Sequence, residues 1–409
     1  MIAHMKNPRR ILVVTERFFP ESFIVNELVE SLVQRGLSVT VLTQEPSYPR
    51  GRVFKGYKNK LVSIDGWHGA RVVRFKTIPG YRDSLVIKLF NYLWFALYGS
   101  IVAVLLPWRF DDVFIFQTGP LSMSVPAIAY AKLHHRPVRI WTQDVWPDSV
   151  YAYGFGQGPF LRIPLEAFVR WVYRAVEVVF MTCTEFSKSL VRFTSKPLVY
   201  APSWPMVPYV SGNTRPANEL PVFLFAGNTG KVQNLENLIK GFAIAWRRNP
   251  QIGILRIVGD GSAWKSLESL IKTEAVPVQL PGRKSTAEMQ KEYEQADFLV
   301  LSLASNEIFR RTLPAKFSMY LSVGKPILCA ASGVCANLVG EHALGFIADP
   351  DEIGSIAEAF ALAGKCPPTE YAQFAANAKN LLEKEFDQEI IIKRLIETAS
   401  SAVLREGMP

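Results

Sequence analysis

The 409-residue sequence lacks the motifs of most metal, redox and hydrolytic enzymes. Its four cysteines include no pair separated by two residues, which excludes a zinc ribbon or a redox dithiol. It has no His-Glu-x-x-His and no Gly-x-Ser-x-Gly motif, so neither a zinc peptidase nor a serine hydrolase is supported. No Gly-x-Gly-x-x-Gly follows its first apolar run, which argues against a nicotinamide or flavin enzyme.

The N-terminus also lacks the pattern of an export signal. Residues 1–10 carry Lys6, Arg9 and Arg10, but only a strand-length apolar run follows them. A signal peptide needs about 7 to 15 consecutive apolar residues at this place. We therefore expect a protein of the reducing cytoplasm, in keeping with its few cysteines.

Positive charge is concentrated in one half of the chain. Residues 1–210 hold 25 basic and 14 acidic side chains, whereas residues 211–409 hold 21 basic and 22 acidic ones. This imbalance predicts that the first half faces a polyanion, for which nucleic acid and an anionic membrane are the usual candidates. A merely solvated basic surface is the alternative.

The first half of the sequence alternates between strand-like and helix-like segments. Buried strands are predicted at 11–14, 39–42, 113–116, 138–141 and 178–181, each separated from the next by a helix-length segment. Units of this kind build a doubly wound parallel sheet. We predict a Rossmann-like α/β domain over residues 1–201.

A second domain of the same class is predicted after a linker. Residues 202–221 contain five prolines, which neither a helix nor a strand accommodates. Strands are then predicted at 222–226, 254–258, 298–301 and 327–329 within a domain over residues 222–385. Residues 386–409 are expected to form a C-terminal helix that covers this domain or crosses back to the first. Two such domains facing across a cleft would bind ligands at the carboxyl ends of their strands.

Three turns at strand ends of the second domain form a predicted anion site. Their candidate residues are Asn228, Thr229, Gly230, Lys231, Gly259, Asp260, Gly282 and Arg283. Because the carboxyl ends of parallel strands meet at one edge, their amide groups and cations can reach one phosphorylated ligand. A structural role is the alternative for each turn taken alone, and the spacing is not that of a P-loop.

Asp144 is the acidic candidate of the first domain. It follows the predicted strand 138–141, where a carboxylate can stabilise a developing cation or accept a proton. A helix N-cap is the alternative for Asp144, and more strongly for Asp148.

A membrane-facing surface is predicted in the first domain. Residues 85–106 are mostly apolar and long enough to span a bilayer. Because a helix is required here between two strands, we favour a helix whose aromatic face, with Trp94 and Phe95, lies in the membrane interface. Five basic residues precede it with no acid among them: Arg50, Arg52, Lys55, Lys58 and Lys60. Each would add about 1 kcal/mol of binding near anionic lipid.

Short motifs also occur in a specific order along nearly the whole chain. They are Phe19-Pro20-Glu21 with Asn26-Glu27-Leu28, 36–43, 46–51, 143–148, 226–231, 259–261, and Pro314-Ala315-Lys316 ending in Gly324-Lys325-Pro326. In these motifs the sequence resembles the family 4 glycosyltransferases. Within that family it is most similar to the bacterial branch that builds surface polysaccharides, such as O-antigen or capsule, from UDP-linked N-acetylated aminosugars.

The resemblance implies a GT-B architecture and a metal-independent reaction. A sugar would pass from a nucleotide diphosphate to an acceptor hydroxyl with retention of anomeric configuration. Lys231, Arg283 and Lys316 match the cations that neutralise the leaving diphosphate, helped by the N–H groups of Thr229 and Gly230. Lys316 and Asp144 are the expected catalytic residues. The acceptor is expected to contact Phe19, Pro20, Glu21 and Tyr48.

Several positions depart from the family pattern. Arg311 and Met319 stand where the family has two glutamates, the second of which contacts the ribose. Asn228 and Gln233 replace the usual Arg and Lys of the nucleotide-domain turn. These departures place the diphosphate on Lys231 and Lys316.

We therefore expect a retaining glycosyltransferase that moves a sugar, expected to be an N-acetylated aminosugar, from a UDP-sugar to a polyprenyl-diphosphate-linked saccharide. It would bind peripherally to the anionic cytoplasmic face of the bacterial inner membrane, with no cofactor and no nucleic acid. The alternatives are a UDP-sugar 2-epimerase of the same architecture and a membrane-associated binding protein without catalytic activity.

Overall fold

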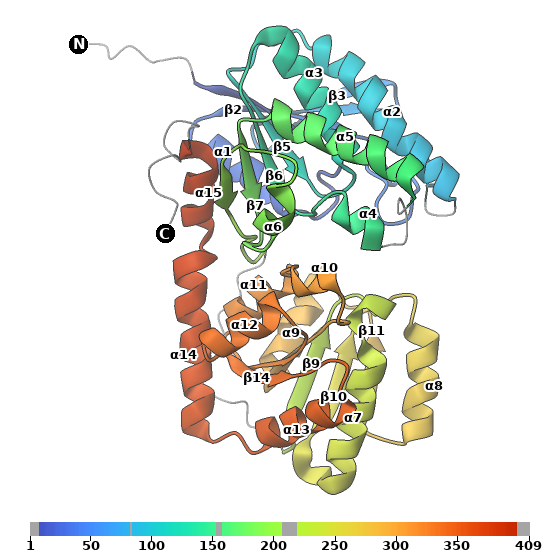
Figure 1. Ribbon diagram of the computed structural model, residues 1–409, viewed down its shortest axis with the longest axis vertical. Coiled ribbons are helices and arrows are strands. Elements are labelled where there is room, and N and C mark those ends of the chain that lie inside the picture. Colours follow the sequence, from blue (N-terminus) through green and yellow to red (C-terminus); the bar gives the residue numbers. More distant parts are fainter. Residues whose placement is uncertain (1–7, 82–83, 153–157, 207–218, 399–409) are drawn as a thin grey trace, which may run out of the picture. The chain divides into compact units, whose positions relative to one another are not determined.

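The computed structural model describes residues 8–81, 84–152, 158–206 and 219–398. The chain forms two compact units, each built around its own sheet (Figure 1). Unit 1 comprises residues 1–202 together with 392–409, and unit 2 comprises residues 203–391. The predicted fold class, two Rossmann-like α/β domains with parallel sheets, is confirmed.

Unit 1 contains an eight-stranded sheet with the order β3-β4-β2-β1-β5-β6-β7-β8. The strands are β1 (Arg10–Thr15), β2 (Ser38–Gln44), β3 (Val62–Trp67), β4 (Ala70–Phe75), β5 (Asp112–Gln117), β6 (Val138–Thr142), β7 (Val178–Met181) and β8 (Leu198–Tyr200). Every pairing is parallel except that of β3 with β4. Strands β1, β2, β5, β6 and β7 confirm the five predicted ones, because unbroken apolar runs are typical of strands buried on both faces.

The helices of unit 1 connect these strands. They are α1 (Ile24–Gln34), α2 (Leu85–Val104), η1 (Leu121–Ser124), α3 (Val125–His134), α4 (Asp148–Ala152), α5 (Pro159–Ala175) and α6 (Phe186–Leu190). Ser84 precedes α2 and its hydroxyl accepts a hydrogen bond from the Ile87 N–H, which caps the helix N-terminus. Helix α3 contacts both α2 and α5.

Unit 2 contains a six-stranded, fully parallel sheet with the order β11-β10-β9-β12-β13-β14. Its strands are β9 (Val222–Ala226), β10 (Ile254–Val258), β11 (Val278–Gly282), β12 (Phe298–Ser302), β13 (Ile327–Ala330) and β14 (Gly345–Ala348). Its helices are η2 (Lys231–Gln233), α7 (Leu235–Arg248), η3 (Pro250–Ile252), α8 (Trp264–Glu274), α9 (Thr286–Gln295), α10 (Glu307–Arg310), α11 (Lys316–Val323), α12 (Val334–Glu341), α13 (Ile353–Gly364) and α14 (Pro368–Glu385). Aromatic contacts such as Phe223 on Phe298, with ring centroids 5.0 Å apart, fill its core.

The C-terminal region forms two helices, and the second begins close to residue 386, where the sequence predicts a C-terminal helix. Helix α14 ends at Glu385 and α15 (Gln388–Glu397) begins after a break at Phe386. The Phe386 ring is buried and lies 6.0 Å from that of Phe317. The buried Phe386 ring thus anchors the connection between α14 and α15. Residues 399–409 of the predicted C-terminal helix lie outside the described residues.

The end of α15 belongs to unit 1. Arg139 on β6 donates hydrogen bonds to the main-chain oxygens of Leu395 and Ile396, at 2.8 and 2.9 Å. Arg394 in turn donates to the main-chain oxygen of Tyr200 on β8, at 2.6 Å. Charged groups at the last carbonyls of a helix stabilise its C-terminus, so these contacts fix α15 to unit 1.

Candidate active site

The three predicted turns of unit 2 lie together at the carboxyl edge of its sheet. They follow β9, β10 and β11, which are neighbours in the sheet. Main-chain hydrogen bonds join them: the Thr229 N–H donates to Asp260 O at 2.8 Å, and the Gly259 N–H donates to Gly282 O at 3.0 Å. One small ligand can therefore contact all three turns.

Two glycines bring this edge close enough to hold Lys316. Gly259 has a φ of +146°, and a Cβ there would lie 1.8 Å from Gly227 O. Gly227 has the same φ, and a Cβ on it would lie 3.0 Å from Lys316 Nζ. Only glycine adopts this backbone without strain and leaves room for the lysine.

Lys316 is the first residue of α11, and its amine is buried without a counter-charge. The Nζ atom has no hydrogen-bond partner among the residues that the structure describes, and it lies 3.9 Å from the centre of the Phe225 ring. Burial lowers the pKa of Lys316 to about 7. A buried amine of this kind is a site prepared for an anion, whose charge would restore the protonated form.

Two further polar atoms of this edge are buried and have no partner among the described residues. They are Thr229 Oγ1 and Gln233 Oε1. Buried polar atoms in native proteins are nearly always paired, so such a group indicates a ligand position. The amide of Thr229 is not part of it, contrary to our sequence prediction, because it already donates to Asp260 O. For the Gly230 amide the prediction stays open to test.

The other predicted donor residues are exposed on the same edge. Lys231 begins η2, Arg283 follows β11, and the side chains of Asn228 and Asp260 also face solvent. Sequence reasoning treated Lys231, Arg283 and Lys316 alike. The structure distinguishes them, because only Lys316 has a desolvated amine, in which an electrostatic contact is strongest.

Lys325, a residue of the family motif, has a structural role. Its Nζ donates to three main-chain oxygens at the end of α9: those of Tyr293 at 2.6 Å, Glu294 at 2.8 Å and Ala296. Burial lowers the pKa of Lys325 to about 8. The side chain thus caps the C-terminus of α9 and is not part of the candidate site at the carboxyl edge of the sheet.

Asp144 lies just beyond the carboxyl end of β6, as predicted, and is largely buried. The hydroxyl of Ser149 donates to its Oδ1. Burial raises the pKa of Asp144, although hydrogen bonds from Ser149 and Trp146 oppose the shift. Asp148, in contrast, is held by Ser189 and by an ion pair with Arg192 at 2.6 Å; these contacts are not those of the predicted N-cap.

A pocket of about 360 Å³ lies at the carboxyl ends of β1, β2 and β5 in unit 1. We call it the Arg17 pocket; it is lined by Glu16, Arg17, Phe23, Tyr48, Pro49, Tyr81, Lys88, Tyr92, Thr118 and Gly119. Arg17 pairs with Glu16 at 2.8 Å and donates to the hydroxyl of Tyr81 at 3.3 Å. Sequence reasoning missed Glu16 and Arg17, because it considered their turn only for the glycines it lacks.

The predicted acceptor residues take different positions. Tyr48 lines the Arg17 pocket. Glu21 is buried, and its Oε1 accepts hydrogen bonds from the N–H groups of Ser47 and Tyr48, at 2.8 and 2.6 Å. It therefore positions the loop that carries Tyr48, and its predicted contact with the acceptor is not supported. Phe19 faces another pocket, and Pro20 is half-buried.

The predicted membrane surface is partly corrected. Arg50, Arg52, Lys55, Lys58 and Lys60 are all exposed. Phe95, however, is only 2% exposed and packs against Phe75, while Trp94 stacks on Tyr98 with ring centroids 4.5 Å apart. The exposed face of α2 is mainly aliphatic; it consists of Val86, Leu89, Phe90, Leu93, Leu97 and Ile101, each more than half exposed. We call this face the α2 stripe.

Length and composition alone would let α2 cross a membrane, and it is the one helix among the described residues for which this holds. Its most apolar window is 28% buried inside the protein. In the same described ranges, no three His, Cys, Asp or Glu side chains group as a metal ion would require.

Comparisons with known proteins identify the family. Residues 23–202 match the family model of the glycosyl transferase 4-like domain. Residues 211–381 match that of the glycosyl transferases group 1. The chain is a glycosyltransferase of the GT-B superfamily. Comparison with curated protein sequences finds no match.

Solved structures share the fold of this glycosyltransferase at low sequence identity. Sucrose-phosphate synthase from Thermosynechococcus elongatus has a TM-score of 0.64 at 15% identity, covering 95% of this chain and 97% of that one. HepE from Anabaena, in complex with UDP and glucose, has a TM-score of 0.66 at 14% identity, covering 96% and 100%. An α,α-trehalose 6-phosphate synthase from Burkholderia multivorans has a TM-score of 0.68 at 12% identity, covering 99% and 100%.

Proposed function

We propose that this glycosyltransferase transfers a sugar from a UDP-sugar to a lipid-linked saccharide at the cytoplasmic face of a bacterial inner membrane. Its product would serve cell-surface polysaccharide synthesis. The observation that carries the proposal is the buried amine of Lys316 at the carboxyl edge of unit 2, which has no partner in the described part of the chain. A group of this kind suits a diphosphate on which negative charge develops during transfer.

The binding site for the UDP-sugar donor is proposed to lie at the carboxyl edge of the sheet in unit 2. When the bond between the sugar and the diphosphate breaks, charge builds on the leaving phosphate oxygens. Lys316 stabilises that charge in a site from which water is excluded, and Thr229 Oγ1 offers a hydrogen bond beside it. HepE, which shares the fold, binds UDP, and this supports uridine as the nucleotide. The motif resemblance favours an N-acetylated aminosugar as the group transferred.

Asp144 is proposed to act in unit 1. Its raised pKa and partial burial suit a carboxylate that stabilises positive charge at the anomeric carbon or receives a proton. Ser149 fixes the orientation of this carboxylate by donating to one of its oxygens.

The acceptor side is proposed to combine the Arg17 pocket with the α2 stripe. Lys88 and Tyr92 of α2 line the pocket, and the stripe runs along the exposed face of the same helix. A saccharide in the pocket with its lipid along the stripe would place both parts of a polyprenyl-linked acceptor. The exposed basic residues 50–60 would attract anionic headgroups.

The test is sugar transfer in anionic liposomes that contain a polyprenyl-diphosphate saccharide, with a panel of UDP-sugars as donors. We expect product only when the lipid acceptor is present. The variant Lys316→Met should lower turnover about a hundredfold or more, because one transition-state contact is lost. Lys272→Met removes an exposed amine of the same unit and serves as the control.

Two results would contradict the proposal. Near-normal transfer by Lys316→Met would show that the diphosphate binds elsewhere. Conversion of the UDP-sugar to an epimer without any acceptor would instead establish the 2-epimerase reaction.

A further inference from the structure

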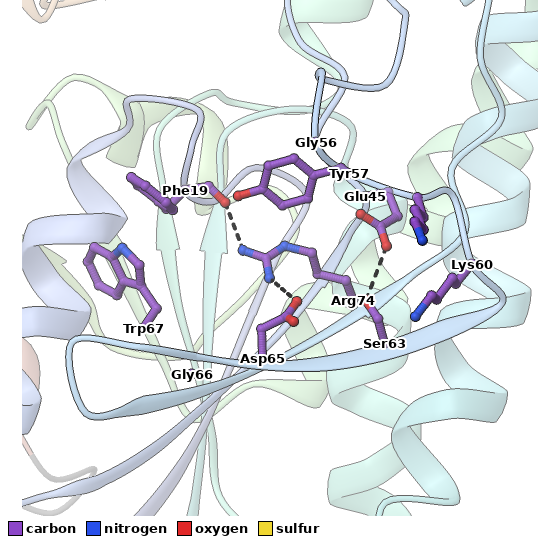
Figure 2. A pocket seen from close by; sticks show the side chains of 11 residues that line it. Phe19, Glu45, Gly56, Tyr57, Lys60, Ser63, Asp65, Gly66, Trp67 and Arg74 are labelled. Atoms are coloured by element: carbon purple, nitrogen blue, oxygen red, sulfur yellow. Dashed lines mark hydrogen bonds and ion pairs between the residues drawn. The ribbon is translucent and has the colours of Figure 1, made fainter.

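A second pocket of unit 1, of about 510 Å³, lies beside the β3–β4 hairpin (Figure 2). We call it the Arg74 pocket; it is lined by Phe19, Glu45, Gly56, Tyr57, Lys58, Lys60, Ser63, Asp65, Gly66, Trp67 and Arg74. Its volume is within the range of small-ligand sites, which is about 300 to 1,000 Å³. No residue proposed for the donor, Asp144 or the Arg17 pocket lines it.

Arg74 is buried in the middle of this pocket and is already neutralised. Its Nη1 pairs with Asp65 at 2.8 Å, and its Nη2 donates to the main-chain oxygen of Phe19 at 2.9 Å (Figure 2). The third nitrogen, Nε, is buried and has no partner among the described residues. The guanidinium thus has donors to spare, Nε–H first among them, but little free charge.

Glu45 supplies the complementary acceptor. Its side chain accepts a hydrogen bond from the Ser63 hydroxyl through Oε1, at 3.1 Å, and its buried Oε2 has no partner within the described residues. Burial raises the pKa of Glu45, although the hydrogen bond from Ser63 and the charges of Arg74 and Lys60 oppose the shift.

Aromatic rings form the other wall. Phe19 and Trp67 lie side by side with ring centroids 5.7 Å apart, and Tyr57 lies over Arg74 (Figure 2). The indole Nε1 of Trp67 is a third buried polar atom without a partner in the described part of the chain. Two donors, one acceptor and flat apolar surfaces therefore surround one cavity.

We propose that the Arg74 pocket binds a neutral pyranose unit of a saccharide. Sugar hydroxyl groups both donate and accept hydrogen bonds, and the ring carries an apolar C–H face, which together match this set of groups. Arg74 is paired with Asp65 and therefore offers little free charge to a phosphate, although the exposed Lys58 and Lys60 also line the pocket.

The occupant is a further sugar unit of the acceptor glycan, an assignment that rests on the proposed function. The same two loops border both pockets of unit 1. Arg17 and Tyr48 line the Arg17 pocket, whereas Phe19 and Tyr57 line the Arg74 pocket. An acceptor longer than one sugar can then contact both.

The experiment is saturation-transfer NMR of the full-length protein with methyl glycosides of glucose and N-acetylglucosamine. We expect binding by the wild type. Glu45→Gln removes the charge and turns one of the two acceptor oxygens into an amide donor, which should weaken binding about tenfold. Tyr48→Ala removes a side chain that lines only the Arg17 pocket, where a glycoside can also bind, so the part of the binding that depends on Glu45 should persist in this variant; thermal unfolding checks that both variants fold.

These outcomes separate the two proposals, since glycoside binding needs no transfer reaction. If neither glycoside binds the wild type, or if Glu45→Gln binds as tightly, the inference is overturned whatever the transferase assay shows. If binding is lost in Tyr48→Ala and kept in Glu45→Gln, the sugar occupies the Arg17 pocket and the inference is also overturned. Binding that only Glu45→Gln weakens supports it even if no transfer from UDP-sugars is found.

Discussion

Two lysines of unit 2 show how single residues acquire different roles through burial. Both Lys316 and Lys325 have lowered pKa values because their amines are desolvated. The amine of Lys325 donates hydrogen bonds to three main-chain oxygens, and these bonds replace the water that the amine loses on burial. Lys316 satisfies none among the described residues, so its amine is available to a ligand.

Nucleotide binding should therefore change the protonation of Lys316. In the free protein its pKa is about 7, and a bound diphosphate raises it. At pH 8 the free amine is mostly neutral and the bound one charged, so UDP binding takes up protons and its affinity falls as pH rises above about 7. Calorimetry at pH 8 in buffers of different ionisation enthalpy measures this uptake, which Lys316→Met should abolish.

Lys325 should matter for stability instead. Lys325→Met leaves three main-chain oxygens at the end of α9 without this donor, of which that of Ala296 is buried, and we expect a loss of about 2 kcal/mol in the free energy of unfolding. Chemical denaturation measures it, with the exposed Lys272→Met as control. Equal stability of the two variants would show that α9 does not depend on this cap.

At the scale of helices and strands, α2 is unusual because its exposed face carries apolar side chains. Its buried face contacts the sheet and α3, whereas its opposite face exposes the α2 stripe to solvent. Contiguous exposed apolar faces of this kind mark interaction surfaces. Membrane binding should then depend on the stripe more than on the aromatic rings.

Charges placed on the stripe test this view. Leu89→Asp with Leu93→Asp should reduce sedimentation with anionic liposomes about tenfold or more, because two apolar side chains no longer enter the interface. Thermal stability should not change, since both side chains are exposed. Leu362→Asp, on an exposed face of α13 in unit 2, is the control. Unchanged sedimentation of the double variant would refute a membrane role for α2.

Elements were more predictable than the site because their signals are local. Runs such as Ile11–Val14 and Val178–Met181 are apolar throughout, and the sequence alone marks them as buried strands. The β3–β4 hairpin was missed because β3 is an exposed edge strand with Asp65 and Gly66 in it. The contact of Phe386 with Phe317 could not be predicted, because the two residues are distant in sequence.

The site could be predicted only as a set of turns. Glycines 227, 259 and 282 indicate the carboxyl edge of the sheet in unit 2, since each lies at the end of a strand. Whether Lys316 or Lys231 has the desolvated amine depends on how α11 packs over Phe225, which no local pattern records. The Arg74 pocket was likewise hidden, because its residues come from loops and strands spread over residues 19–74.

At the scale of the whole molecule, the last helix of the chain completes the first unit. Ile392 and Leu395 are buried, and α15 is held by Arg139 and by the oxygen of Tyr200. Leu395→Ala should destabilise unit 1 by about 2 to 5 kcal/mol, the cost of a cavity in a packed core. Hydrogen exchange of β6 and β7 should accelerate, while β9 and β10 should keep their protection; equal acceleration in both units would contradict this.

Because α15 returns to unit 1, unit 2 is an insertion within the chain of unit 1. A ribosome releases β1 to β8 long before it releases the residues that pair with Arg139. During synthesis, unit 1 therefore lacks its last helix until the end of the chain is released. Unit 2 is one continuous segment, so all of its residues are available for folding before that point. Translation that stops before residue 392 would leave unit 2 complete and unit 1 without the residues that bind Arg139 and the oxygen of Tyr200.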